Sequence, residues 1–133
     1  MAFPISVTFR GMAHSDPVEA HIRHKAERLS RWATGIVSCI VTVDVPHRHH
    51  LHGNRYRVRI LVTLPGETVV VGHRAGHEAD ADRAYQDLHA AIETAFDDAG
   101  RMMVEVGDRR RARMHARAQE EERREARVRQ AVS

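Results

Sequence analysis

The clearest hydrophobic pattern in the chain is a strict alternation over residues 53–64. Apolar side chains occupy every second position from Tyr56 to Leu64, and arginines occupy positions 55, 57 and 59 between them. Because successive side chains of a β-strand point to opposite faces, this period predicts a half-buried antiparallel strand with one core face. The other face is expected to lie open on a small sheet and to meet something anionic, since no acid interrupts its arginines.

Three further segments have strand patterns. Residues 5–9 alternate and are followed by Gly11, residues 36–45 are apolar enough for a central strand, and residues 67–73 follow a Pro-Gly turn. Inward positions are expected at Val37, Cys39, Val41, Val43 and Val45, and in the last strand at Val69 and Val71. A slip of one residue would bury the arginines, together with Arg10, so the register is strongly constrained.

Two segments have the spacing of amphipathic helices. The first is expected to begin with Asp16 as N-cap and Pro17 at the first helical position, and to end at Thr34-Gly35. The second is expected to begin near Asp80 and to be weakened in its last turns by Gly100. Each buries one face, and the rest of the second helix is acidic.

The element order β-α-β-β-β-α predicts an α+β fold, with a four-stranded mixed sheet and two helices packed on one face. This domain is expected to span residues 1–104. Residues 105–133 consist mainly of arginine, glutamate and alanine, and predict a charged C-terminal tail that is either helical or disordered.

Composition and charge indicate the cellular compartment in which the protein is expected. The chain has 133 residues, a net charge of +3 and one cysteine, Cys39. Nine arginines and six acids lie in residues 105–133, so this segment accounts for the net charge. A lone cysteine in an apolar run is typical of a buried side chain in a reducing compartment. With no basic leader and no long apolar run, the expected location is the cytoplasm, without membrane contact.

Candidate binding residues gather in two places. The first helix carries a stripe of basic and imidazole side chains spaced three and four apart, which is either a solvated face or a phosphate-binding surface: His21, His24, Lys25, Arg28 and Arg31. The loop after the central strand contains His47, Arg48, His49, His50 and His52. This loop predicts hydrogen bonds to phosphate or ribose, a divalent-metal site, or only a polar surface.

Catalytic chemistry has no visible site. The sequence contains no glycine-rich phosphate loop, nucleophile elbow or paired-cysteine zinc motif, and its paired carboxylates stand at ordinary helix positions. We therefore expect a protein that is not an enzyme and has no cofactor.

Several dispersed segments resemble the ribosome hibernation factors, also called ribosome-associated translation inhibitors or ribosomal subunit interface proteins. These segments are ISVTFRGM at 5–12, VSC at 37–39, PHRHH at 46–50, YRVRI at 56–60 and DLHAAI at 87–92. The resemblance covers about residues 3–104. It implies a fold like a double-stranded-RNA-binding domain, placed on the small ribosomal subunit across the channel for messenger and transfer RNA, where it blocks translation and protects idle ribosomes.

The resemblance also implies rRNA contacts from basic residues on both helices. The first-helix stripe fits this pattern, but the second helix has acids where the family commonly has lysine and arginine, leaving Arg101 alone. One possibility is that the arginines just beyond that helix supply the rRNA contacts instead: Arg109, Arg110, Arg111 and Arg113. The other is that the ribosomal contact is weakened. The implied partner is the small subunit and its rRNA, not DNA. The dimerising C-terminal domain of longer members is missing, so pairing of ribosomes through that domain is not expected. The open sheet face is too polar to suggest a large hydrophobic dimer interface, although a sheet edge could pair, so we expect a monomer or a weak dimer.

Two alternatives from other classes stay open. The acidic second helix or the Arg/Glu tail could dock a protein partner, so that the chain acts as a protein-interaction module. Alternatively, the loop His47–His52 could make the chain responsive to a divalent metal.

Overall fold

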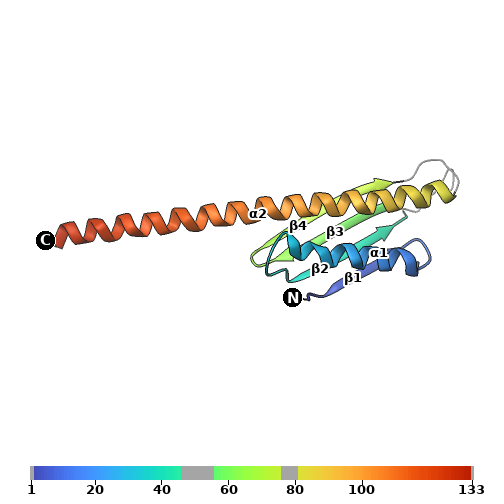
Figure 1. Ribbon diagram of the computed structural model, residues 1–133, viewed down its shortest axis with the longest axis horizontal. Coiled ribbons are helices and arrows are strands. Elements are labelled where there is room, and N and C mark those ends of the chain that lie inside the picture. Colours follow the sequence, from blue (N-terminus) through green and yellow to red (C-terminus); the bar gives the residue numbers. More distant parts are fainter. Residues whose placement is uncertain (1, 46–55, 76–80, 133) are drawn as a thin grey trace. The chain divides into compact units, whose positions relative to one another are not determined.

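The computed structural model describes residues 2–45, 56–75 and 81–132, with side chains at 2–45, 56–73 and 88–132. In chain order, the elements are β1 (Ile5–Arg10), α1 (Asp16–Glu27), the 3₁₀ helix η1 (Arg28–Arg31), β2 (Ser38–Asp44), β3 (Tyr56–Leu64), β4 (Glu67–Ala75) and α2 (Ala81–Val132) (Figure 1). The predicted α+β class and the element order are confirmed.

The four strands form one mixed sheet in the order β1-β2-β3-β4. β1 pairs with β2 in parallel, and the other two pairings are antiparallel. Residues Val58, Ile60 and Val62 of β3 are fully buried, whereas Arg57 and Arg59 are exposed. The predicted register of β3 is therefore confirmed, because the arginines occupy the face opposite the core.

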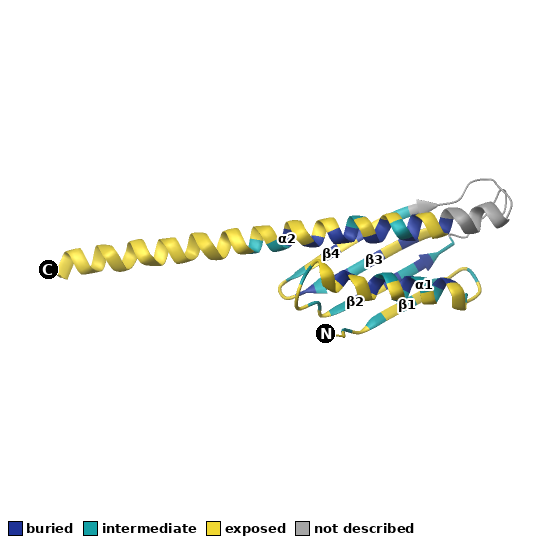
Figure 2. Ribbon diagram, in the orientation of Figure 1, coloured by how far each residue is buried: buried dark blue, intermediate teal, exposed yellow. Residues whose placement is uncertain are grey.

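Both helices lie on the same face of the sheet within residues 1–103 (Figure 1). Figure 2 marks buried residues in dark blue on both helices and on strands of the sheet. The helices contribute the following buried side chains: Val18, Ile22 and Ala26 from α1, Leu29 from η1, and Leu88, Ala91, Ile92, Ala95, Phe96, Ala99 and Met103 from α2. One apolar layer between helices and sheet thus forms the core of this unit.

Two expectations for the first half of the chain were wrong. The N-cap is Ser15 rather than Asp16, because Ser15 is extended and its hydroxyl accepts a hydrogen bond from the Val18 N–H at 3.4 Å. Val37 does not point into the core, because it precedes β2 at the end of the sheet and its side chain is 51% exposed. The α-helix also gives way to the 3₁₀ helix η1 after Glu27.

Gly100 does not lie in the last turns of the second helix, where it was expected to weaken the helix, because α2 continues to Val132. The glycine instead lies against Trp32, and a Cβ added to it would come within 3.1 Å of the indole Nε1. The missing side chain therefore lets the indole approach the α2 backbone closely. Glycine lowers the stability of a helix, and close packing against Trp32 offsets this loss at Gly100.

The chain divides into two compact units, Met1–Met103 and Val104–Ser133. In the second unit residues 104–132 are helical, and all side chains from 111 to 132 are exposed. None of the described helices has a segment long and apolar enough to cross a membrane.

Cys39 provides a chemical test of the packing. Burial raises the pKa of its thiol to about 11. At pH 8 the fraction of nucleophilic thiolate is therefore about 100-fold lower than for a cysteine with an ordinary pKa. Because the folded pKa is raised, the contribution of the neutral thiol to stability is complete below pH 9 and is lost as the pH rises toward 11. We expect a disulfide reagent at pH 8 to label the native chain at least 100-fold more slowly than the denatured chain. Equal rates would contradict the buried position.

Candidate functional site

The predicted stripe on the first helix is divided in two by the structure. His24, Arg28 and Arg31 are exposed. His21 and Lys25 are different, because only 20% of each side chain is exposed and both contact Glu93 of α2. Three of the five stripe residues therefore face solvent, and two belong to the contact between the helices.

Glu93 is the acidic centre of that contact. The Lys25 ammonium lies 2.5 Å from Glu93 Oε2, and His21 Nε2 lies 3.3 Å from Glu93 Oε1. The hydrogen bond from Lys25 is the main reason why the pKa of Glu93 lies below its usual value. The charge of Lys25 is thus largely satisfied inside the protein rather than offered to an external anion.

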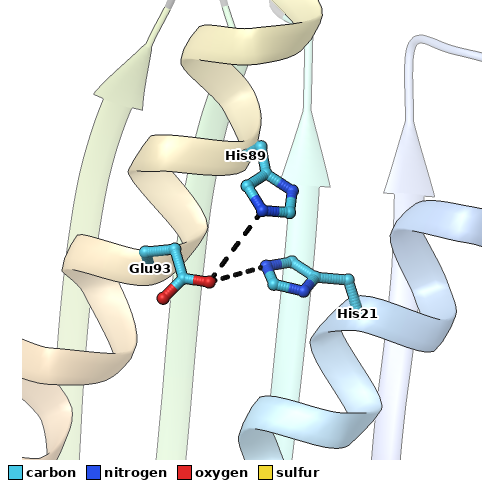
Figure 3. A group of neighbouring side chains, drawn as sticks. All are labelled: His21, His89 and Glu93. Carbon is cyan, nitrogen blue, oxygen red and sulfur yellow. Dashed lines mark ion pairs between the residues drawn. The ribbon is translucent and has the colours of Figure 1, made fainter.

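His21 is also stacked on His89 of α2. The two ring centroids are 4.0 Å apart, with an angle of 17° between the planes. Figure 3 shows both rings directed toward the same carboxylate, and His89 Nε2 lies 3.9 Å from Glu93 Oε1. The pKa of His21 is lowered, first by burial and then by the nearby charge of His89, which favours the neutral ring.

The exposed cations of η1 have the character of an anion-binding surface. Arg28 and Arg31 are carried by the same 3₁₀ helix, one turn apart. Among the residues that the structure describes, no acidic side chain forms an ion pair with either of them. Their guanidinium groups are therefore available to a phosphate, for which arginine offers a fork of donors.

The open face of the sheet carries a second set of arginines. Arg10, Arg57 and Arg59 are exposed on it, but Asp44 lies in register between Arg10 of β1 and Arg57 of β3. The next row on this face holds Thr42 beside Arg59. The row after that is apolar, because Ile40, Leu61 and Val70 are aligned across three strands. This face is less uniformly basic than the alternation of β3 predicted.

The predicted cation of the second helix is paired locally. Arg101 forms an ion pair with Asp98, although its own side chain remains 74% exposed. Asp98 also lies 2.5 Å from His73 Nε2 of β4. Asp98 therefore serves internal contacts with one residue of the sheet and one of the helix.

The structure describes only some of the remaining predicted residues. Arg109, Arg110 and Arg111 belong to the second unit, where Arg111 is 2.5 Å from Asp108. The loop residues lie outside the described part of the chain: His47, Arg48, His49, His50 and His52, together with Arg55. Their predicted roles stay predictions.

Comparison with known proteins establishes the family. The model of the family described as "Sigma 54 modulation protein / S30EA ribosomal protein" matches residues 5–111. The chain belongs to this family. No curated protein sequence matches it significantly.

Two solved structures share the fold of this S30EA family chain. The N-terminal domain of Thermus thermophilus Protein Y is 24% identical, with a TM-score of 0.56 over 76% of this chain and 94% of that one. A ribosomal subunit interface protein from Coxiella burnetii is 15% identical, with a TM-score of 0.56 over 79% of this chain and 98% of that one. The likeness in both cases is one of fold.

Sequence reasoning missed the cluster of His21, His89 and Glu93. The sequence contained one signal of this cluster. His89 and Glu93 are four residues apart, so they lie on the same face of the second helix of this S30EA family chain. Their meeting with His21 depends on how the two helices pack on the sheet. The spacing of residues within either helix alone does not predict that arrangement.

Proposed function

We propose that this S30EA family chain binds the small ribosomal subunit through rRNA phosphates, inhibits translation and stabilises idle ribosomes, without catalysis. The observation that carries the proposal is the exposed basic surface formed by His24, Arg28 and Arg31. Family membership supports an association with the ribosome. The choice of the small subunit and the effect on translation are the parts of the proposal that experiments must test.

The physical basis is neutralisation of the RNA backbone. Arginine side chains that contact phosphates release condensed counterions, which gives an affinity that is strong at low salt and largely independent of sequence. Folded RNA presents phosphates and 2′-hydroxyls in a fixed A-form geometry that a rigid protein surface can recognise by shape. Blocking a ribosomal channel in this way requires a stable fit and no bond-making chemistry.

Ion pairs inside the protein distinguish the basic residues that can contact RNA directly from those that cannot. Lys25 and His21 are held by Glu93, so in our proposal they shape the surface rather than bind phosphate directly. Arg101 keeps an exposed side chain despite its ion pair with Asp98, and we propose it as an outer contact. Arg109, Arg110 and Arg111 are proposed to supply further basic contacts, together with the loop residues His47, Arg48, His49 and His50.

A titration of purified ribosomal subunits tests the proposed partner. Protein labelled at an added N-terminal fluorophore is titrated with small subunits and, separately, with large subunits at about 50 mM salt, where phosphate contacts are strongest. We expect the small subunit to bind at least about 10-fold more tightly, which corresponds to about 1.4 kcal/mol. Equal affinities would indicate nonspecific attraction to RNA and would contradict the choice of subunit.

A further inference from the structure

The contact between α1 and α2 contains a set of metal-ligand side chains. His21 of α1 faces His89 and Glu93 of α2, and one ligand atom from each residue lies within 4.8 Å of the others (Figure 3). All three residues belong to the unit Met1–Met103. The cluster does not include the exposed arginines of η1.

One atom of this cluster has an unsatisfied bonding capacity. His21 Nε2 is buried and makes no hydrogen bond, although Glu93 Oε1 is 3.3 Å away. A buried ring nitrogen without a partner is costly. An ion bound between the ring and the carboxylate would give this nitrogen a partner.

The distances suit a small divalent ion. Zinc binds imidazole nitrogen and carboxylate oxygen at about 2.0–2.2 Å, so two ligands of a tetrahedral site lie about 3.3 Å apart. His21 Nε2 and Glu93 Oε1 already have this separation. His89 Nε2 is 3.9 Å from the same oxygen, and its side chain is 56% exposed. The exposed His89 ring is therefore free to turn out of its stack and direct its nitrogen toward the ion.

The two carboxylate oxygens of Glu93 have different neighbours. Oε2 accepts Lys25 at 2.5 Å, whereas Oε1 faces both imidazoles. The carboxylate can thus keep its contact with Lys25 while its other oxygen binds an ion. A ligand set of two imidazoles and one carboxylate suits Zn²⁺, Ni²⁺ or Co²⁺, and leaves a coordination position for water.

We propose that His21, His89 and Glu93 form a divalent transition-metal site that links α1 to α2. The bound ion would join α1 to α2 at the point where Glu93 already contacts His21 and Lys25. Its binding stabilises the folded unit, because the three ligands are brought together only in the folded chain.

The test uses the full chain with the four loop histidines replaced, since they would bind metal by themselves. In this His47→Gln, His49→Gln, His50→Gln and His52→Gln background, CoCl₂ is added and the visible d–d bands of protein-bound cobalt are recorded, with ZnCl₂ titrated by calorimetry. We expect one equivalent of either ion per chain. At free zinc about 100 times the dissociation constant, the melting temperature should rise by roughly 10 °C.

Three variants in the same background locate the ion. His89→Gln changes an exposed side chain and should preserve the circular dichroism spectrum, yet it should weaken metal binding by more than about 100-fold, since losing even an outer-shell partner costs about 10- to 100-fold. Lys25→Gln removes a positive charge and should tighten binding by about 10-fold for an ion about 5 Å away. His115→Gln, at an exposed position in the second unit, should leave binding unchanged.

Two outcomes overturn the proposal. The first is the absence of stoichiometric binding of Co²⁺ and Zn²⁺ in the background chain. The second is binding that neither His89→Gln nor Lys25→Gln alters, which would place the ion elsewhere. A loss specific to His89→Gln, with His115→Gln unaffected, supports the site.

Discussion

Arg28→Glu combined with Arg31→Glu is expected to lower the affinity for the small ribosomal subunit by about 100-fold or more. Each exposed arginine in contact with a phosphate contributes about 1.5 kcal/mol or more as a charge-assisted hydrogen bond, and the new carboxylates add repulsion. The slope of log affinity against log salt should also become less negative by about 2. Binding curves at several salt concentrations measure both quantities.

Two double variants control for the change in net charge. Arg117→Glu with Arg124→Glu alters exposed residues of the second unit by the same four charge units and should reduce affinity much less. Arg57→Glu with Arg59→Glu makes the same change on the open sheet face. If this last pair abolished binding while the Arg28 and Arg31 variant bound normally, the interface would lie on the sheet and our assignment would be wrong.

Ile60→Ala is expected to lower the free energy of unfolding by about 2–5 kcal/mol. Ile60 is fully buried in β3, so its truncation removes apolar contacts and leaves a cavity between sheet and helices. Such a loss is a large part of the stability of a domain of this size. Chemical denaturation followed by circular dichroism measures it.

Ile40→Ala is the matched control. Ile40 lies in β2, the strand paired with β3, and its side chain is 42% exposed on the opposite face. The same truncation there should cost less than about 1 kcal/mol, because little buried surface is lost. Equal losses in the free energy of unfolding at the two positions would contradict the assignment of Ile60 to the buried face and Ile40 to the open face of the sheet.

The fold could be predicted from the sequence because its signals are local and agree with one another. The alternation over Tyr56–Leu64 determines which face of β3 is buried, since a slip of one residue would bury Arg57 and Arg59. The parallel pairing of β1 with β2 follows from the helix that connects them. The errors, at Val37 and at the N-cap, were of one or two residues at the ends of elements.

The internal pairing of the second helix could not be predicted in the same way. Glu93 and Asp98 looked like surface acids because each stands at an ordinary helical position. The structure brings Glu93 to Lys25 and Asp98 to His73, which are distant in sequence. Such pairs depend on the packing of whole elements, so the spacing within one helix carries no sign of them.

These pairs change how the acidic second helix is interpreted. An acid that already contacts a protein cation repels RNA less than a free one, because its field is largely cancelled at short range. Glu93 and Asp98 therefore do not oppose the proposed RNA surface as strongly as their number suggests. The exposed side chains of His24, Arg28 and Arg31 form no ion pair with an acid among the residues that the structure describes.

Sedimentation with purified small subunits through sucrose, at about 50 and about 300 mM salt, tests the central claim most directly. With about six phosphate contacts, the slope of log affinity against log salt is roughly −4 to −5, so affinity should fall about 1,000-fold or more between the two conditions. We expect the chain to pellet with the small subunit at the lower salt concentration and to remain in the supernatant at the higher one. A chain that stays in the supernatant at about 50 mM salt, or that pellets equally at both concentrations, would contradict a phosphate-based ribosomal interface.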